Sequence, residues 1–316
     1  MTSARPADMD RPVGEEGIRL LVVLGPTASG KTRMAVALAR ALGGEVLSAD
    51  SRQVYRGLTI GTGKDLAEYG QVPVHLVDLL EPAERYSVYR FQRDCFGALR
   101  AVAGRGALPV LCGGTGLYLE AVLERYEMSE VAPDEKLRAE LAALSLDALA
   151  ARLARSRRLH NVTDLKSRQT LIRAVEIAER SAGAPAPKWP ALQPLVLGAR
   201  WDRAELDSRI RARLVARIEA GMIEEAERLH AAGLSLARMD ELGLEYRYLA
   251  RLLAGELDRE ALVEQLGRAI RRFARRQLSW FRRMERRGWA IHWIDRADAG
   301  RALEIAAGRF GPDGRD

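Results

Sequence analysis

The chain has very little cysteine, since Cys95 and Cys112 are its only two among 316 residues. Two cysteines are too few for a disulfide framework or for a cysteine-rich metal site. Cys112 ends an apolar run, where a thiol is expected to pack as a small apolar group. We therefore expect a protein of the reducing cytoplasm that is not stabilised by disulfides.

Long uncharged apolar segments are also missing from the sequence. No such run approaches the roughly 20 residues that a membrane-spanning helix needs. Residues 1–16 are polar and contain no apolar core of a signal peptide, so we interpret them as a disordered tail. These absences predict a protein with neither a membrane segment nor a secretory signal.

What the chain does contain is a phosphate-loop signature directly after an apolar strand. Residues 20–24 run into the pattern G-x-x-x-x-G-K-[ST], and a helical segment follows. The glycines let backbone N–H groups turn toward phosphate oxygens, and the helix N-terminus adds partial positive charge. The alternative, a chance glycine-rich turn, does not account for the flanking strand and helix. We predict phosphate binding by Gly25, Pro26, Thr27, Ala28, Ser29, Gly30, Lys31 and Thr32, with the Thr32 hydroxyl as a ligand of Mg²⁺.

The order of apolar runs predicts an α/β fold. Candidate strands at 18–24, 45–49, 74–79, 107–112, 195–199 and 290–294 are separated by helical segments. Between 126 and 190 the sequence is helical and rich in Ala, Leu, Arg and Glu, a gap too long for a βα connection. We predict a P-loop NTPase-like core with a parallel sheet flanked by helices, formed by residues 17–125 and 191–316. Residues 126–190 are predicted to form an all-helical insertion domain.

Positive charge is concentrated near the C-terminus. The net charge is +7, and nine arginines lie between residues 268 and 287, opposed there only by Glu285. Apolar residues are interleaved with them at helical spacing, which predicts a helix with one packed face and one basic face. The basic face fits either a solvated surface or a contact surface for a phosphate backbone.

Three further polar loops accompany the predicted strands. They are Asp50 and the residues after it, the G-T-G-K sequence at 61–64 and the G-G-T-G sequence at 113–116. Because the carboxyl ends of parallel strands meet at one edge of a sheet, we expect these loops to lie near the phosphate loop. Asp50 then has three possible roles: a Mg²⁺ ligand, a general base or a helix N-cap.

Together, these motifs resemble the tRNA dimethylallyltransferases, also called the isopentenyl-diphosphate:tRNA transferase family. The series comprises G-P-T-A-S-G-K-T at 25–32, S-A-D-S-R-Q-V-Y at 48–55, G-T-G-K at 61–64, H-L-V-D at 75–78, G-G-T-G-L-Y at 113–118 and R-R-Q-L-S-W-F-R at 275–282. The resemblance spans about residues 18–295. The ordered set is far more specific than any single motif in it.

The resemblance implies transfer of a dimethylallyl group from dimethylallyl diphosphate to N6 of adenine 37, in tRNAs that read codons beginning with U. It implies Mg²⁺ as the cofactor and a base flipped into a channel through the protein. By position, Asp50 is the base, with Thr27 and Lys31 beside the diphosphate. We also expect a monomer. Contacts to the tRNA anticodon stem-loop are implied for Asp50, Ser51, Arg52, Gln53, Thr115, Arg138, Arg168, Arg173, Arg275 and Arg276.

The chain departs from the family pattern at three points. Thr170 stands where an arginine is common, and we assign Arg168 as its replacement. The usual G-Y-R/K-Q is here G-L-E-Y-R at 243–247, so Arg247 is our assignment for a catalytic arginine on the diphosphate side. Asp65 stands where a proline commonly follows the lysine of G-T-x-K. Three alternatives to this enzyme remain open: an adenine-nucleotide prenyltransferase, a small-molecule P-loop kinase and a non-enzymatic RNA-binding module.

Overall fold

The computed structural model describes residues 17–128, 131, 134–156, 167–180 and 188–311. The chain divides into two compact units, one formed by residues 1–125 with 190–316 and the other by Tyr126–Trp189. The predicted tail, residues 1–16, lies outside the described residues.

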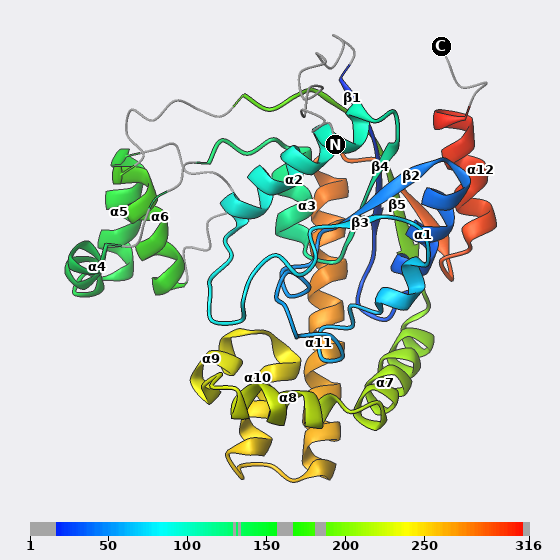
Figure 1. The fold of residues 1–316 in the computed structure, drawn as a ribbon. Helices are drawn as coiled ribbons and strands as arrows, with labels where there is room; N and C mark the ends of the chain where they lie inside the picture. Colours follow the sequence, from blue (N-terminus) through cyan, green and yellow to red (C-terminus); the bar gives the residue numbers. More distant parts are fainter. Residues whose placement is uncertain (1–16, 129–130, 132–133, 157–166, 181–187, 312–316) are drawn as a thin grey trace, which may run out of the picture. The chain divides into compact units, whose positions relative to one another are not determined.

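The first unit is built on a six-stranded parallel sheet with the order β3-β2-β4-β1-β5-β6 (Figure 1). The predicted α/β fold is therefore confirmed. The strands are β1 (Ile18–Leu24), β2 (Gly44–Ser48), β3 (Val74–His75), β4 (Leu108–Gly113), β5 (Leu192–Arg200) and β6 (Ile291–Asp295).

The third strand is shorter than the sequence predicts. The apolar run at 74–79 was expected to be extended throughout, but β3 ends at His75. Leu76 and Asp78 have φ angles of 64° and 51°, in the left-handed region that is incompatible with a strand. The chain therefore leaves the sheet early and turns Asp78 toward the loop that follows β2, whose residue Tyr55 forms a bridge with Leu80.

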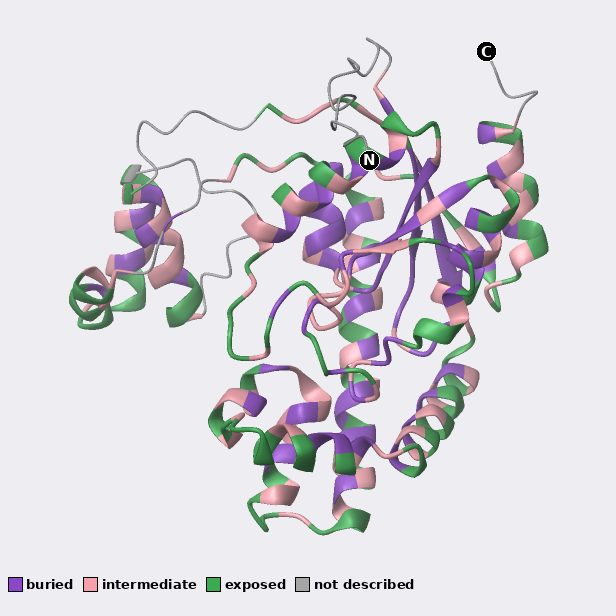
Figure 2. Cartoon of the chain, viewed as in Figure 1, coloured by how far each residue is buried: buried purple, intermediate pink, exposed green. Residues whose placement is uncertain are grey.

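Helices cover both faces of the sheet. Helices α1 (Lys31–Ala41) and α12 (Ala299–Phe310) pack on one face, where they share a core with alternate strand residues such as Leu21 and Val23. Helices α2 (Val88–Gly104) and α3 (Gly116–Leu123) cover the other face, and the long helix α11 (Arg259–Arg286) packs against α3 (Figure 1). Both faces of the strands are buried, as the continuous apolar runs predict (Figure 2).

A helical module lies where the strands end. It comprises α7 (Arg203–Glu219), α8 (Met222–Ala231), α9 (Leu236–Glu241) and α10 (Leu244–Leu253), with the N-terminal half of α11, whereas the short η1 (Leu66–Tyr69) packs on α1. The helices of the module share an apolar core with Ala28 of the phosphate loop and with residues of the loop after β2. Asp202 and Asp258 accept hydrogen bonds from the N–H groups of Ala204 and Ala261, which sets where α7 and α11 begin.

The second unit contains α4 (Glu135–Ala142), α5 (Leu146–Ser156) and α6 (Arg168–Arg180). They pack around a small apolar core that includes Leu141, Leu149, Leu171 and Val175. In the described parts of both units, none of the helices is long and apolar enough to span a bilayer.

Candidate active site

The phosphate loop connects β1 to α1 and has the shape that its glycines allow. Gly30 has a φ of 82°, directly before Lys31 opens α1. Gly25 admits no side chain, since a Cβ there would lie 2.7 Å from Ser29 Oγ. Lys31 Nζ donates to the Pro26 carbonyl at 3.3 Å and so folds back over the loop. The helix N-terminus and the lysine therefore point at the same space, as phosphate binding requires.

Side chains from distant parts of the sequence fix this loop from outside. Gln277 of α11 accepts a hydrogen bond from Thr27 N at 2.9 Å and donates one to Gly114 O at 2.8 Å. Trp201 Nε1 donates to Ser29 O at 2.8 Å, and Arg209 Nε donates to Ala28 O at 2.9 Å. Sequence reasoning missed Gln277, although it lies within the R-R-Q-L-S-W-F-R motif.

Two cavities open on either side of the phosphate loop. One, of about 260 Å³, reaches the residues after β2, and the other, of about 590 Å³, opens between the phosphate loop and α7. Four residues line both cavities, namely Lys31, Thr32, Arg213 and Arg217. We call these the base-side cavity and the phosphate-side cavity. A chemical group transferred from one cavity to the other would therefore pass Lys31, Arg213 and Arg217.

The base-side cavity contains the residues that the sequence places after β2. Asp50, Ser51, Arg52 and Gln53 all line it, together with Thr27 and Thr115. Asp50 Oδ1 accepts a hydrogen bond from Arg52 N at 2.9 Å. The backbone from 51 to 58 forms turns and no helix begins there, so the structure excludes the helix N-cap role for Asp50.

Hydrogen bonds fix the neighbouring positions. Thr115 Oγ1 accepts from Ser51 N at 3.3 Å. Gln53 bridges the cavity wall, because its Oε1 accepts from Ser48 Oγ at 2.8 Å and its Nε2 donates to Gly63 O at 3.1 Å.

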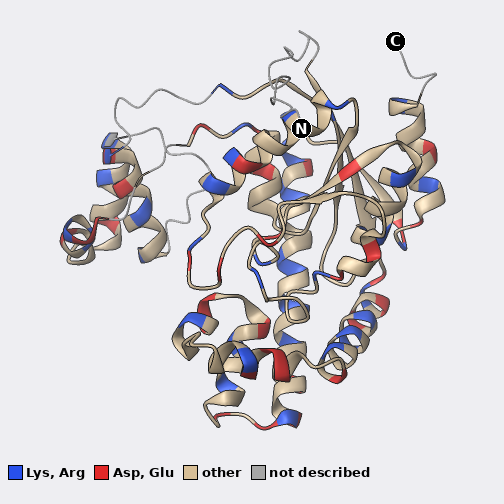
Figure 3. Ribbon diagram, in the orientation of Figure 1, with Lys and Arg blue, Asp and Glu red and all other residues tan. Residues whose placement is uncertain are grey.

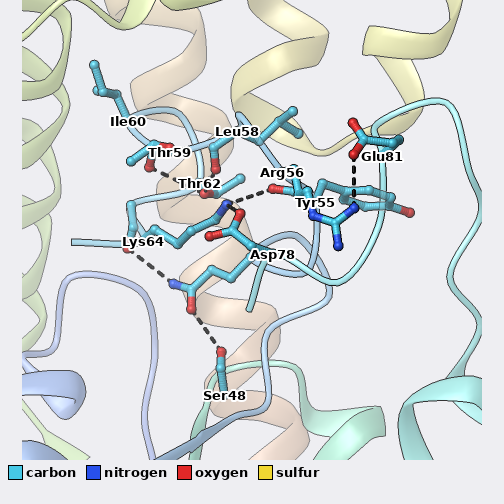
Figure 4. Close-up of polar contacts among 12 residues, drawn as sticks. Ser48, Tyr55, Arg56, Leu58, Thr59, Ile60, Thr62, Lys64, Asp78 and Glu81 are labelled. Carbon is cyan, nitrogen blue, oxygen red and sulfur yellow. Dashed lines mark hydrogen bonds and ion pairs between the residues drawn. The ribbon is translucent and has the colours of Figure 1, made fainter. Parts of the chain in front are cut away.

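The G-T-G-K loop is anchored by buried charges (Figure 4). Lys64 is 1% exposed, donates to Tyr55 O at 2.6 Å and pairs with Asp78, so it is a structural cation rather than a ligand group. Glu225 of α8 accepts from the N–H groups of Thr59, Ile60 and Gly61 at 2.8–3.0 Å. These contacts hold the loop that brings Thr62 and Gly63 to the base-side cavity.

Arg213 and Arg217 of α7 form most of the positive charge beside Lys31. Burial, reinforced by the charge of Arg213, lowers the pKa of Arg217, and its Nη2 is buried with no hydrogen-bond partner in the described structure. Burial also lowers the pKa of Lys31. Buried, incompletely neutralised cations favour an anionic ligand. Sequence reasoning missed both arginines; their only signal is an i, i+4 spacing that puts them on one helix face.

Comparisons with known proteins establish the family of the chain. The model of the family described as IPP transferase matches residues 53–284, and that described as isopentenyl transferase matches residues 18–71. The chain belongs to the IPP transferase family. The resemblance stated from the sequence is thus confirmed.

Members of this family with curated names or solved structures cover most of the chain. A protein named tRNA dimethylallyltransferase 1 from Geotalea daltonii is 53% identical over 279 residues, which are 88% of this chain and 91% of that protein. The tRNA dimethylallyltransferase 2 of Pelobacter propionicus is 56% identical over 280 residues, 87% and 89% of the two chains. The solved tRNA isopentenylpyrophosphate transferase of Bacillus halodurans is 33% identical, with a TM-score of 0.68 over 92% of this chain and 96% of that one.

Within this IPP transferase, Arg247 lies on the base side. It lines the base-side cavity, where its Nε pairs with Asp240 Oδ1 at 3.0 Å. It does not line the phosphate-side cavity, which Arg213 and Arg217 do. The geometry therefore offers these two arginines for a diphosphate, while a catalytic role for Arg247 stays a prediction.

Helix α11 carries the basic surface that the sequence predicts (Figure 3). Arg275 and Arg276 are exposed and have no carboxylate partner in the described part of the chain, and Arg276 also lines the base-side cavity. Arg283 and Arg287 differ from them, because both pair with the fully buried carboxylate of Glu120 on α3. Two of the nine arginines therefore fasten the helix to the fold.

The remaining predicted tRNA contacts belong to the second unit. Arg138 forms two hydrogen bonds of 3.0 Å with Glu176, and Arg173 pairs with the same carboxylate at 2.6 Å. Arg168 donates to the Ala142 and Leu144 carbonyls. All three guanidinium groups thus have partners within this unit, and their contact with tRNA stays a prediction.

Proposed function

We propose that the chain transfers a dimethylallyl group from dimethylallyl diphosphate to N6 of adenine 37, in tRNAs that read codons beginning with U. The products are N6-dimethylallyladenosine and diphosphate. The relatives' names support the reaction type. The observation that carries the proposal is the wall shared by two cavities, with Asp50 on one side and a cluster of Lys31, Arg213 and Arg217 facing both.

The donor fits the phosphate-side cavity. Its diphosphate would accept hydrogen bonds from the loop N–H groups and from Lys31, Arg213 and Arg217. Bond breaking at the carbon that bears the diphosphate transfers an electron pair to the leaving group. Cations that are already fixed in place stabilise this charge without reorganising.

The adenine fits the base-side cavity. An exocyclic amine is a weak nucleophile, so an oxygen that accepts its proton as the new N–C bond forms assists the reaction. Asp50 provides that oxygen, because hydrogen bonding to Arg52 N occupies only its Oδ1. The base reaches this position only when it leaves the anticodon stack, as other base-modifying enzymes require.

The residues present also fit Mg²⁺. In the described part of the chain, no three His, Cys, Asp or Glu side chains converge on one point. Mg²⁺ commonly takes only one or two protein ligands and completes its shell with phosphate oxygens and water. Thr32, which lines both cavities, would hold it through its hydroxyl. When bound, Mg²⁺ supplies charge neutralisation on the departing diphosphate.

The test is a direct assay for product. The purified chain is mixed with dimethylallyl diphosphate, Mg²⁺ and an unmodified anticodon stem-loop with adenines at positions 36–38, and the RNA is analysed by mass spectrometry. A matched stem-loop with guanine at position 37 is the control. We expect one added dimethylallyl group, located at adenine 37.

Other outcomes would contradict the proposal in different ways. Prenylation of AMP or ATP but not of the stem-loop would identify an adenine-nucleotide prenyltransferase. Phosphate release from ATP without any prenylated product would indicate a kinase or an ATPase. Stem-loop binding without either product would indicate an RNA-binding module.

A further inference from the structure

The phosphate-side cavity contains an internal carboxylate in contact with its arginines. Asp65 Oδ2 lies 2.7 Å from Arg213 Nη2 and 3.9 Å from Arg217 Nη2. Asp65 and Glu68 both line this cavity, but Glu68 pairs with Arg33 instead, at 3.5 Å. A single carboxylate oxygen is therefore shared between the two guanidinium groups that line both cavities.

The arginines need this negative charge when no anion is bound. Arg217 is only 13% exposed, and the carboxylate of Glu245 lies 4.0 Å from its Nη1. The neighbouring charge of Arg213 also disfavours its charged form. Two like charges held close together in a partly dry wall are costly unless a counter-ion is near. Asp65, whose side chain is partly exposed to solvent, supplies this counter-ion to Arg213 and Arg217.

The backbone holds Asp65 at this position. It directly follows the buried Lys64, which Tyr55 and Asp78 anchor, and its own φ of 42° lies in the left-handed region. Gly63 completes the fit, because Arg217 Nη2 occupies the space that a Cβ would take. The anchored backbone of this turn therefore holds the Asp65 carboxylate next to the two arginines.

We propose that Asp65 is an internal counter-ion that pairs with Arg213 and Arg217 in the free protein and is displaced from them by a diphosphate. It would therefore lower the affinity of the site for the prenyl donor and for the diphosphate product alike. This inference rests on the proposed donor site.

Asp65→Asn tests the inference, because asparagine tolerates a positive φ and keeps the side-chain size while removing the charge. Binding of inorganic diphosphate is measured by calorimetry with and without Mg²⁺, for the full chain and the variant. We expect the variant to bind roughly three- to fivefold more tightly, the range for an ion pair of half-exposed groups. In steady-state assays the KM for dimethylallyl diphosphate should fall by a similar factor with no rise in kcat, as expected for binding that is equal in ground and transition states.

Glu68→Gln is the matched control, because it removes one negative charge from the same cavity without touching Arg213 or Arg217. An equal gain in both variants would overturn the inference in favour of a long-range field. Weaker diphosphate binding by Asp65→Asn in the presence of Mg²⁺ would also overturn it, since Asp65 would then serve the metal. Equal affinities for the full chain and the Asp65 variant would overturn this inference alone. No diphosphate binding by the full chain would overturn the proposed donor site as well.

Discussion

At the residue scale, Asp50 combines an observed structural role with a proposed chemical role, and one substitution can separate the two. Its Oδ1 accepts from Arg52 N and so shapes the turn that lines the base-side cavity. In the proposed reaction, its carboxylate would also accept the proton of the adenine amine. Asparagine keeps an acceptor oxygen for the turn but is not a base, so Asp50→Asn removes the second function while preserving the first.

We expect Asp50→Asn to reduce prenylation at saturating substrates by about 100- to 10,000-fold, the usual contribution of a general base. The affinity for the unmodified stem-loop should stay within about twofold, because the turn is intact. A twofold change in affinity corresponds to less free energy than one hydrogen bond contributes. Single-turnover assays and a filter-binding titration measure the two quantities. Asp50→Ala, which also removes the hydrogen bond within the turn, should be equally inactive. Full activity in either variant would remove Asp50 from the role of base.

Gln277 is expected to act by positioning the phosphate loop and not by contacting the substrates. Its side-chain amide accepts a hydrogen bond from Thr27 N in the phosphate loop and donates one to Gly114 O. The amide packs so closely on Gly114 that a Cβ at this glycine would clash with it. Gln277→Leu fills similar space but leaves both backbone groups unpaired. We expect kcat/KM for dimethylallyl diphosphate to fall by about 10- to 100-fold, as small displacements of reacting groups do.

Gln265→Leu, on the same helix but far from the phosphate loop, is the control for a general effect on α11. Thermal unfolding of both variants shows whether the loss is one of stability. A positioning role predicts a defect that persists well below the melting temperature. Equal kinetics for Gln277→Leu and Gln265→Leu would show that the amide bridge is dispensable.

At the scale of elements, α11 combines packing and charge along one helix. Its apolar residues, such as Phe281 and Met284, are buried, and Arg283 and Arg287 bond to the buried Glu120. Arg275 and Arg276 remain exposed. Exposed arginines without a carboxylate partner in the described part of the chain are suited to an RNA backbone, whose binding releases counter-ions and depends on salt.

We expect the double charge reversal Arg275→Glu with Arg276→Glu to weaken stem-loop binding and to flatten its salt dependence. The slope of log K against log salt should decrease in magnitude by about one to two, because each phosphate that an arginine neutralises contributes roughly 0.7–0.9 to it. Titrations at several salt concentrations give the slope. The same double reversal at the exposed Arg228 and Arg309, on α8 and α12, is the control. An unchanged slope would exclude α11 from the RNA interface.

The elements also show what sequence alone could predict. Strands buried on both faces appear as apolar runs, so β1, β2, β4, β5 and β6 were located to within a few residues. The run at 74–79 did not form a strand throughout. Beyond His75 only Leu76 is buried, Leu79 is exposed, and the chain turns back to the loop at Tyr55 instead of pairing in the sheet. Local patterns also identified Asp50 and the phosphate loop. They could not identify Arg217 or Gln277, since Gln277 reaches Thr27 across 250 residues and only the folded chain brings them together.

At the scale of the whole molecule, the two units are stabilised in different ways. The unit of residues 1–125 and 190–316 buries two large apolar cores, one between the sheet and helices α1 and α12 and one within the helical module. The unit Tyr126–Trp189 has a small apolar core, and carboxylates of α6 join its helices. Glu176 of α6 bonds to Arg138 of α4, and Glu179 of α6 bonds to Arg152 of α5.

Acid should therefore loosen the unit Tyr126–Trp189 first. Burial opposes ionisation of Glu176, but hydrogen bonds from Arg138 and Arg173 outweigh it, so its pKa lies below the usual value. The hydrogen bond from Arg152 lowers the pKa of Glu179 in the same direction. A carboxyl with a depressed pKa in the folded state adds stability above its unfolded pKa, about 4.3, and loses it as the pH falls through the folded value. Stability from these pairs is thus complete at neutral pH and decreases below about pH 4.

Hydrogen exchange, corrected for the pH dependence of the intrinsic rates, follows each unit separately. We expect peptides from 134–156 and 167–180 to lose protection below about pH 4 while peptides from β1 and β4 keep it, because apolar burial does not titrate. Glu179→Gln removes one of the titrating pairs, so this variant should be less protected at neutral pH and should change less on acidification. Loss of protection in both units at the same pH would show that the small unit does not depend on its ion pairs. It would mean instead that the chain unfolds in one cooperative step. Glu45 of β2, whose pKa Arg105 at the end of α2 holds below its usual value, would contribute in the same direction.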